Sequence, residues 1–309
     1  MTKRARLIAN PAARTLPSRD RLVIAPAWLR LHGWEVDSFR SESSAHATAL
    51  AREAAEQGYD AVIAAGGDGT VNDVVNGIAG TETALAVIPG GTANVWSRET
   101  GTPSHPGSVA AMLEGGRRAR IDLGLAGERY FLLMTSLGLD SAVVAMVTGA
   151  AKSRHGRLAY IARGLQEALH YRGVDAEITA DGETWRMPLL VALLGNTRSY
   201  GGLISISNRA HAADGLLDLV TYRAAGVAPF ALDLARTAVG RHAGKGGTRY
   251  RHVREAFITT TPAVPVQADG EIVGSTPMRF TIVPRALTVI LPPDRRPPAL
   301  EEKGGEERR

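Results

Sequence analysis

The stretch AVIAAGGDGTVNDVVNGI, from Ala61 to Ile78, joins a short apolar run to a glycine-rich turn and then to a second apolar segment. The first run predicts a buried strand, and the residues from Val71 to Ala79 predict a helix. A glycine-rich turn before a helix lets backbone N–H groups approach phosphate oxygens, whose charge the helix N-terminus favours. The stretch therefore predicts a phosphate-binding turn in an α/β domain.

The same alternation of strand and helix extends from residue 5 to about residue 100. The expected strands are 5–10, 33–39, 59–66 and 84–89, and the expected helices are 19–32, 45–57 and 71–79. Strands separated by helices form right-handed βαβ units with a parallel sheet covered on both faces. We therefore expect an open α/β nucleotide-binding domain over residues 1–122, with ligands at the carboxyl ends of its strands.

Beyond about residue 118 the candidate strands follow one another directly. They are 174–180, 183–195, 215–223, 254–260, 264–269, 278–283 and 286–291, interrupted by expected helices at 157–171 and 228–240. Runs of strands with polar turns are typical of an antiparallel β-sandwich. We expect this second domain over residues 123–293. Its last strand, at about 284–292, could instead belong to the sheet of the first domain. The charged, proline-rich residues 294–309 predict a disordered tail.

Composition narrows the class of protein. The chain has 309 residues, 44% of them hydrophobic, and no cysteine, which favours a reducing compartment and excludes thiolate metal sites. It contains no run of about 20 apolar residues, so we expect a soluble, cytoplasmic protein. The net charge is +5, and basic residues crowd 152–172 and 241–254. Such patches suit nucleotide phosphates, nucleic acid or an anionic membrane, or they form a solvated face. Because no RNA-type aromatic motif accompanies them, we expect no nucleic-acid partner.

Asp68, in the middle of the glycine-rich turn, requires its own explanation. A carboxylate among phosphates would repel them unless a divalent cation lay between, so Asp68 predicts Mg²⁺. The alternative is that Asp68 only caps the following helix, since Asp is a favoured N-cap residue.

Six motifs in order carry a resemblance to a known family. They are NPAAR (10–14), GGDGTVNDVVNGIAG (66–80), IPGGTANVWSRE (88–99), YGG (200–202), ADGLLDLV (213–220) and VQADGE (266–271). Together they resemble the diacylglycerol kinase catalytic-domain family, the lipid kinases that include bacterial diacylglycerol kinases and sphingosine kinases. The resemblance covers residues 5 to about 291.

The resemblance implies an ATP- and Mg²⁺-dependent lipid kinase and assigns roles residue by residue. Glu271 matches the general base, and Asp68 matches the position that organises Mg²⁺–ATP. The positions that match ATP-binding residues are Asn10, Pro11, Ala12, Ala13, Arg14, Ser41, Gly66, Gly67, Asp68, Gly69, Thr70, Val71, Asn72, Gly91, Thr92 and Asn94. The positions that match metal ligands are Asp68, Asp122, His211, Asp214 and Leu216, with His211 and Leu216 contributing carbonyls to a structural Mg²⁺.

Departures from the family pattern keep parts of this assignment open. Ala13 and Arg14 stand where the family usually has serine and glycine, and no proline precedes the ADG turn of Asp214. The DG of ADGE also fits a hairpin turn, which is compatible with presenting Glu271. Asp140 either lines a lipid pocket or starts a helix.

Several acceptors and partners are compatible with the resemblance. The acceptor is diacylglycerol or, alternatively, a sphingoid base, another glycerolipid or NAD. The alternative to a kinase is a protein of a different class, a catalytically silent sensor of lipid or nucleotide. We expect peripheral association with the inner membrane face through a basic surface that includes Arg249, Arg251 and Arg254. Relatives are often dimers, so a homodimer is a further expectation.

Overall fold

The computed structural model describes residues 2–13, 22–142, 144, 171–200, 204–205, 210–226, 229–230, 232–233, 248–294, 297 and 300. The chain divides into two compact units. The first contains residues 1–123, 211–214 and 283–309, and the second contains residues 124–210 and 215–282. The expected helices at 157–171 and 228–240, the YGG motif and the predicted tail lie wholly or mostly outside the described residues.

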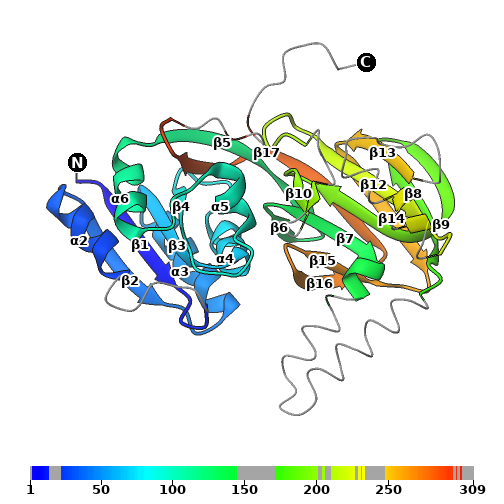
Figure 1. The fold of residues 1–309 in the computed structure, drawn as a ribbon, viewed down its shortest axis with the longest axis horizontal. Coiled ribbons are helices and arrows are strands. Elements are labelled where there is room, and N and C mark those ends of the chain that lie inside the picture. The colour runs from blue at the N-terminus through cyan, green and yellow to red at the C-terminus, as the bar shows by residue number, and fades with distance from the viewer. Residues whose placement is uncertain are drawn as a thin grey trace. The chain divides into compact units, whose positions relative to one another are not determined.

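The first unit is an α/β unit with a parallel sheet (Figure 1). Its strands are β1 (Arg4–Ala9), β2 (Glu35–Arg40), β3 (Ala61–Gly66) and β4 (Ala84–Pro89), in the order β2-β1-β3-β4, and β17 (Met278–Leu291) follows β4. All four pairings are parallel, with Thr288 and Val289 of β17 beside Ala84 and Leu85. The prediction of an open α/β domain with a parallel sheet is confirmed.

Helices pack on both faces of this sheet. On one face, α2 (Ile24–Leu31) and α6 (Pro106–Gly115) share a core with alternate residues of the strands, including Leu29, Val109 and Ile63. On the other face, α3 (Ser44–Glu56) packs against α4 (Asp68–Ile78), and these helices contact β1, β3 and β4. The short helix α5 (Val95–Thr100) follows the loop after β4. Sequence patterns did not predict α5 and α6.

The second unit is built from antiparallel strands. They are β6 (Arg129–Phe131), β7 (Met134–Gly138), β8 (Val174–Ala180), β9 (Glu183–Gly195), β10 (Ser199–Tyr200), β11 (Ile204–Ser205), β12 (Leu217–Arg223), β13 (Thr248–Val253), β14 (Glu255–Thr261), β15 (Pro265–Ala268) and β16 (Glu271–Ser275). The long strand β9 pairs with β8 through its first half and with β7 and β12 through its second half. Alternate residues of these strands enclose an apolar core that includes Ile178, Leu194, Ile258 and Phe280. The predicted β-sandwich class is confirmed.

Two strands, β5 (Arg117–Ala126) and β17, contribute residues to both units. The sequence predicted two strands at 278–283 and 286–291, and this was wrong, because β17 is continuous. Arg285 adopts a left-handed conformation with φ of 53° without ending the strand. Within the described part of the chain, no helix combines the length and apolar character that crossing a membrane requires.

Candidate active site

The predicted nucleotide-binding residues gather at one edge of the first unit's sheet. Strands β1, β2, β3 and β4 run in parallel and end at Ala9, Arg40, Gly66 and Pro89. The candidates follow directly after these ends: Asn10 to Ala13, Ser41, Gly66 to Asn72, Gly91, Thr92 and Asn94. Arg14 lies outside the described residues. Carboxyl ends of parallel strands are where open α/β sheets bind ligands.

Hydrogen bonds connect three of these loops. The Asn10 side chain donates from Nδ2 to Thr70 Oγ1 at 3.1 Å, and its backbone N–H donates to Ala65 O at 3.0 Å. The Gly90 N–H donates to Gly66 O at 2.7 Å. The loop after β3 is therefore fixed to the loops after β1 and β4.

Close contacts explain glycines in two loops. A Cβ added at Gly91 would lie 2.5 Å from the Cα of Gly67, and one added at Gly66 would lie 2.4 Å from Thr70 Oγ1. Real Cβ atoms essentially never come within 3.0 Å of a heavy atom outside their own residue and its chain neighbours. The absence of a side chain at Gly91 and Gly67 thus lets the two loops touch, and its absence at Gly66 leaves room for the Thr70 side chain in the same loop. Both are requirements beyond the approach of a phosphate.

Several candidate side chains maintain the loops and are not available to a ligand. Asn94 is left-handed, with φ of 46°, and its amide accepts from Gly91 N at 2.8 Å and donates to Gly91 O at 2.7 Å. Asn72 is 2% exposed, and its side-chain oxygen accepts from Asn76 Nδ2. Ser41, Thr70 and Val71 are also buried, whereas Pro11, Ala12 and Thr92 are exposed. A nucleotide at this edge would therefore meet mainly backbone groups.

Asp68 is the first residue of α4, and Gly67 is the N-cap residue, with no side-chain capping bond. The interpretation of Asp68 as the N-cap was therefore wrong. Its carboxylate instead accepts from the Trp96 N–H at 3.4 Å. Burial raises the pKa of Asp68 above its ordinary 3.8, and the backbone N–H groups of Trp96 and Val95 oppose the rise. A divalent cation is the species that would favour the ionised carboxylate here, so Asp68 fits Mg²⁺ chemically.

Asp122 and the turn from His211 to Asp214 come together in the first unit. Asp122 is 2% exposed, accepts from the Arg285 N–H at 2.7 Å, and donates its own N–H to Ala212 O at 2.7 Å. The carbonyl of His211 accepts from Ala213 N and Asp214 N at 2.8 and 3.3 Å.

The predicted structural Mg²⁺ at this turn would use the carboxylate of Asp214 and the carbonyls of His211 and Leu216. The His211 carbonyl already accepts the two backbone hydrogen bonds given above. No group of three or more His, Asp or Glu side chains that could hold a metal occurs among the described residues. The structural Mg²⁺ stays a prediction.

Glu271 lies in the second unit as the first residue of β16, directly after the turn that joins it to β15. Asp269 and Gly270 have φ of 47° and 89°, and two positive φ angles define the type I′ turn of tight hairpins. The Glu271 side chain is 44% exposed, and Arg129 Nη2 lies 3.5 Å from its Oε2. Glu271 and Arg129 thus form an ion pair at the end of the hairpin.

Asp269 fixes this turn to the rest of the unit. Its Oδ2 accepts from the Leu132 N–H at 2.7 Å, and its Oδ1 accepts from the N–H groups of Leu133 and Met134 at 3.0 and 2.9 Å. Sequence reasoning missed both Asp269 and Arg129. The left-handed preference of Asp before Gly was the available signal for Asp269, but its partners lie more than 130 residues away in the chain.

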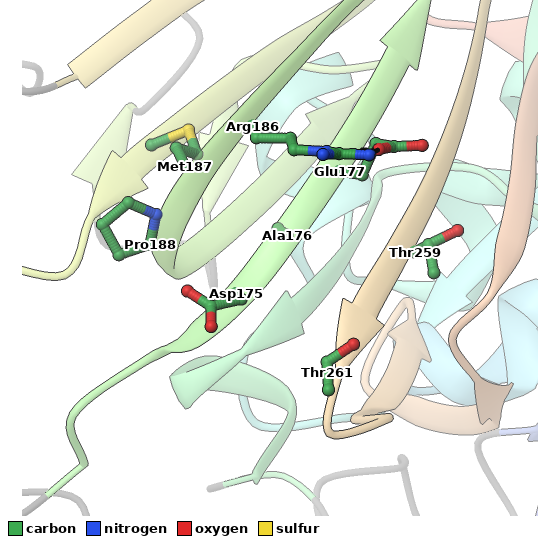
Figure 2. A pocket seen from close by; sticks show the side chains of 8 residues that line it. All are labelled: Asp175, Ala176, Glu177, Arg186, Met187, Pro188, Thr259 and Thr261. Atoms are coloured by element: carbon green, nitrogen blue, oxygen red, sulfur yellow. Dashed lines mark hydrogen bonds and ion pairs between the residues drawn. The ribbon is translucent and has the colours of Figure 1, made fainter.

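A hollow of about 460 Å³ lies elsewhere in the second unit, over β8, β9 and β14 (Figure 2). Figure 2 shows Arg186 lying beside Glu177, to which its Nε donates at 2.6 Å. The remaining lining residues are Asp175, Ala176, Met187, Pro188, Thr259 and Thr261. None of the predicted site residues lines this hollow.

The parallel sheet with helices on both faces and its joined loops define an open α/β protein. Residues 4–126 match the family described as Diacylglycerol kinase catalytic domain, and residues 134–291 match the YegS C-terminal NAD kinase beta sandwich-like domain. The chain is 31% identical over 302 residues to a diacylglycerol kinase of Staphylococcus saprophyticus, covering 95% of this chain and 97% of that protein. It is 29% identical over 297 residues to a diacylglycerol kinase of Bacillus subtilis, covering 95% and 98%.

The fold agrees with a solved structure. The crystal structure of a diacylglycerol kinase from Bacillus anthracis superposes with a TM-score of 0.73 at 20% identity, covering 94% of this chain and 98% of that one. The chain therefore belongs to the diacylglycerol kinase catalytic-domain family and is an enzyme of the lipid kinase class.

Proposed function

We propose that this enzyme transfers the γ-phosphate of ATP, with Mg²⁺, to a lipid hydroxyl, and that diacylglycerol is the acceptor, giving phosphatidic acid. The observation that carries the proposal is Glu271, a half-exposed carboxylate held on a hairpin turn within VQADGE in a chain of this family. A sensor that only binds lipid or nucleotide has no need of such a base.

The residues divide the reaction between them. Backbone N–H groups of the loops after β1, β3 and β4 would bind the phosphates, and Asp68 would hold Mg²⁺, which neutralises phosphate charge when bound. Glu271 would accept the proton of the lipid hydroxyl as that oxygen bonds to the γ-phosphorus. The bond from the γ-phosphorus to the β–γ bridging oxygen then breaks, and ADP leaves.

Access to the acceptor requires contact with a membrane, since diacylglycerol resides in a bilayer. Arg249 and Arg251 of β13 lie 5.1 and 5.6 Å from the Trp185 ring, and both pair with Glu183, Arg251 at 2.6 Å. We infer that this cluster, with the exposed Arg254, contacts the anionic inner face of the membrane from the cytoplasm.

The test is transfer of labelled γ-phosphate to a panel of lipids in mixed micelles. Glu271→Gln removes the base with little change in shape and should lower kcat by roughly 10²- to 10⁴-fold while the KM for ATP is unchanged. Glu177→Gln is the matched control, because Glu177 is 42% exposed and paired with Arg186 much as Glu271 is 44% exposed and paired with Arg129.

The outcomes separate the alternatives. Label in diacylglycerol that is lost only in Glu271→Gln supports the proposal. Label in a sphingoid base, another glycerolipid or NAD would show that diacylglycerol is not the acceptor, although the phosphoryl transfer itself would stand. A wild-type protein that binds ATP and labels none of these acceptors would overturn the kinase proposal in favour of a sensor.

A further inference from the structure

Gln267 lies four residues before Glu271 and is buried, with 4% of the residue exposed. Its Oε1 accepts from the Gly270 N–H at 2.8 Å, directly before Glu271. Its Nε2 donates to Ser136 Oγ at 2.7 Å and to Asp140 Oδ2 at 3.3 Å. The amide of Gln267 is therefore bonded at both ends, to the hairpin turn on one side and to the β7 region on the other.

The bond between Ser136 and Asp140 sets the direction of the others. Ser136 Oγ donates its proton to the Oδ2 of Asp140. Ser136 Oγ then offers a lone pair to Gln267 Nε2, which leaves Oε1 of the same amide facing the Gly270 N–H. One arrangement of donors and acceptors satisfies the whole chain of bonds.

A hairpin does not need this chain of bonds in order to turn. Asp-Gly with two positive φ angles closes a type I′ turn by itself. Here the Gln267 carbonyl also accepts from Thr135 Oγ1 at 2.6 Å. The pairing of β15 with β16 shifts from Val266 beside Gly274 to Gln267 beside Ile272, which is a bulge. Bulges next to active sites re-aim side chains, and here the bulge and the Thr135 bond both lie at Gln267, whose Oε1 in turn binds Gly270, the residue before the base.

We propose that Gln267 is a positioning residue that fixes the direction of Glu271, and that Asp140 orients the Gln267 amide. The inference rests on the proposed function, in which Glu271 is the base. A misplacement of about 1 Å at a reacting group can cost about 10²-fold in rate. Loss of the Gln267 bonds should therefore appear in kcat and leave the binding of ATP unchanged.

The experiment compares Gln267→Met, which keeps the length and burial of the side chain but none of the side-chain hydrogen bonds, with Thr260→Val as control. Thr260 is also buried, at 6% exposed, in the second unit, and it donates to Pro262 O at 2.8 Å without contacting the turn. Gln267→Met should lower kcat by about 10- to 100-fold at unchanged KM for ATP. Thr260→Val should leave kcat within about twofold while lowering the melting temperature comparably.

A double-mutant cycle separates positioning from loss of stability. In a Glu271→Gln background, Gln267→Met should produce no further fall in kcat, since the group that it positions is gone. Asp140→Asn should lower kcat in the same direction, because an amide at 140 can turn a donor toward Gln267 Nε2. Additive losses in the cycle would overturn the inference.

Hydrogen exchange provides a readout that needs no substrate. The Gly270 amide should exchange faster in Gln267→Met and at the wild-type rate in Thr260→Val. Unchanged exchange at Gly270 would overturn the inference whatever the activity. If exchange responds as expected but wild type phosphorylates no acceptor, the proposed function is what fails, and the catalytic role of Gln267 fails with it.

Discussion

Gly91→Ala is the substitution that most directly tests how the loops of the candidate site are joined. The added methyl would lie 2.5 Å from the Gly67 Cα and 3.0 Å from Asn94 Oδ1. Both neighbours belong to fixed groups, a backbone carbon and an amide held by two hydrogen bonds, so neither can rotate away. The loops after β3 and β4 must therefore separate by at least about half an ångström.

Such overpacking typically costs about 1–3 kcal/mol of unfolding free energy. In a unit of 150–250 residues each kcal/mol lowers the melting temperature by roughly 2–4 °C. The KM for ATP should rise as well, because the displaced loop carries backbone N–H groups that we assign to the phosphates. Thermal unfolding and initial rates at varied ATP measure the two effects.

Gly115→Ala is the matched control. A Cβ at Gly115, the last residue of α6, has no heavy atom within 4 Å, so this alanine should be neutral or stabilise by up to about 1 kcal/mol. Our reasoning is refuted if Gly91→Ala has the same melting temperature as Gly115→Ala and the same KM for ATP as wild type. The contact between the loops would then not constrain the site.

Three further predictions concern charged groups. Because the pKa of Asp68 is raised in the folded protein, ionisation of this carboxyl as the pH rises favours the unfolded chain. Without nucleotide, Asp68→Asn should therefore have a higher melting temperature than wild type at pH 7, although it should lack kinase activity. The difference in melting temperature should disappear below pH 3.8, and a lower melting temperature than wild type at pH 7 would contradict this prediction. The two carboxylate oxygens of Asp269 accept from three backbone N–H groups, and Asp269→Asn replaces one of these oxygens by an NH₂ group, which cannot accept. This variant should lower the unfolding free energy by about 1–3 kcal/mol in denaturant titrations. An unchanged unfolding midpoint would show that Asp269 does not anchor the turn. Glu183→Gln should increase the fraction of protein that sediments with anionic liposomes, because it frees Arg249 and Arg251 from their ion pairs. Neutralising both arginines should decrease that fraction. Identical binding by all variants would show that this surface does not contact the membrane.

Local sequence patterns predicted the strands and helices in which apolar and polar residues alternate or in which apolar residues follow one another. The strands at 174–180 and 183–195 have the predicted bounds, because alternating burial and the Asp181–Gly182 turn are both visible in the sequence. Helix α6 was missed although Pro106 in its first turn is an ordinary start signal, because its N-cap residue, His105, is not one of the residue types that usually cap helices. Strand β13 was missed because its basic residues suggested a surface patch and hid its pairing with β12.

The candidate site was predictable where residues close in sequence carry it, as in the turn around Asp68. The contacts between distant segments were not. Gln267 and Ser136 are separated by 131 residues, and no period or composition indicates that they meet. The same limit hid the reason for Gly91, since its neighbour Gly67 comes from another loop.

The first unit is assembled from three separate stretches of chain, and this has a consequence for synthesis on the ribosome. Residues 211–214 supply the carbonyl that binds the Asp122 N–H, and β17 lies beside β4, so β4 has no partner on that edge until residue 291 has been made. An N-terminal unit usually folds while the rest of the chain is still being translated. Here the sheet of the first unit is complete only after the strands of the second unit have been made. A chain that ends before β17 would therefore leave the edge of β4 unpaired, and an unpaired strand edge favours aggregation.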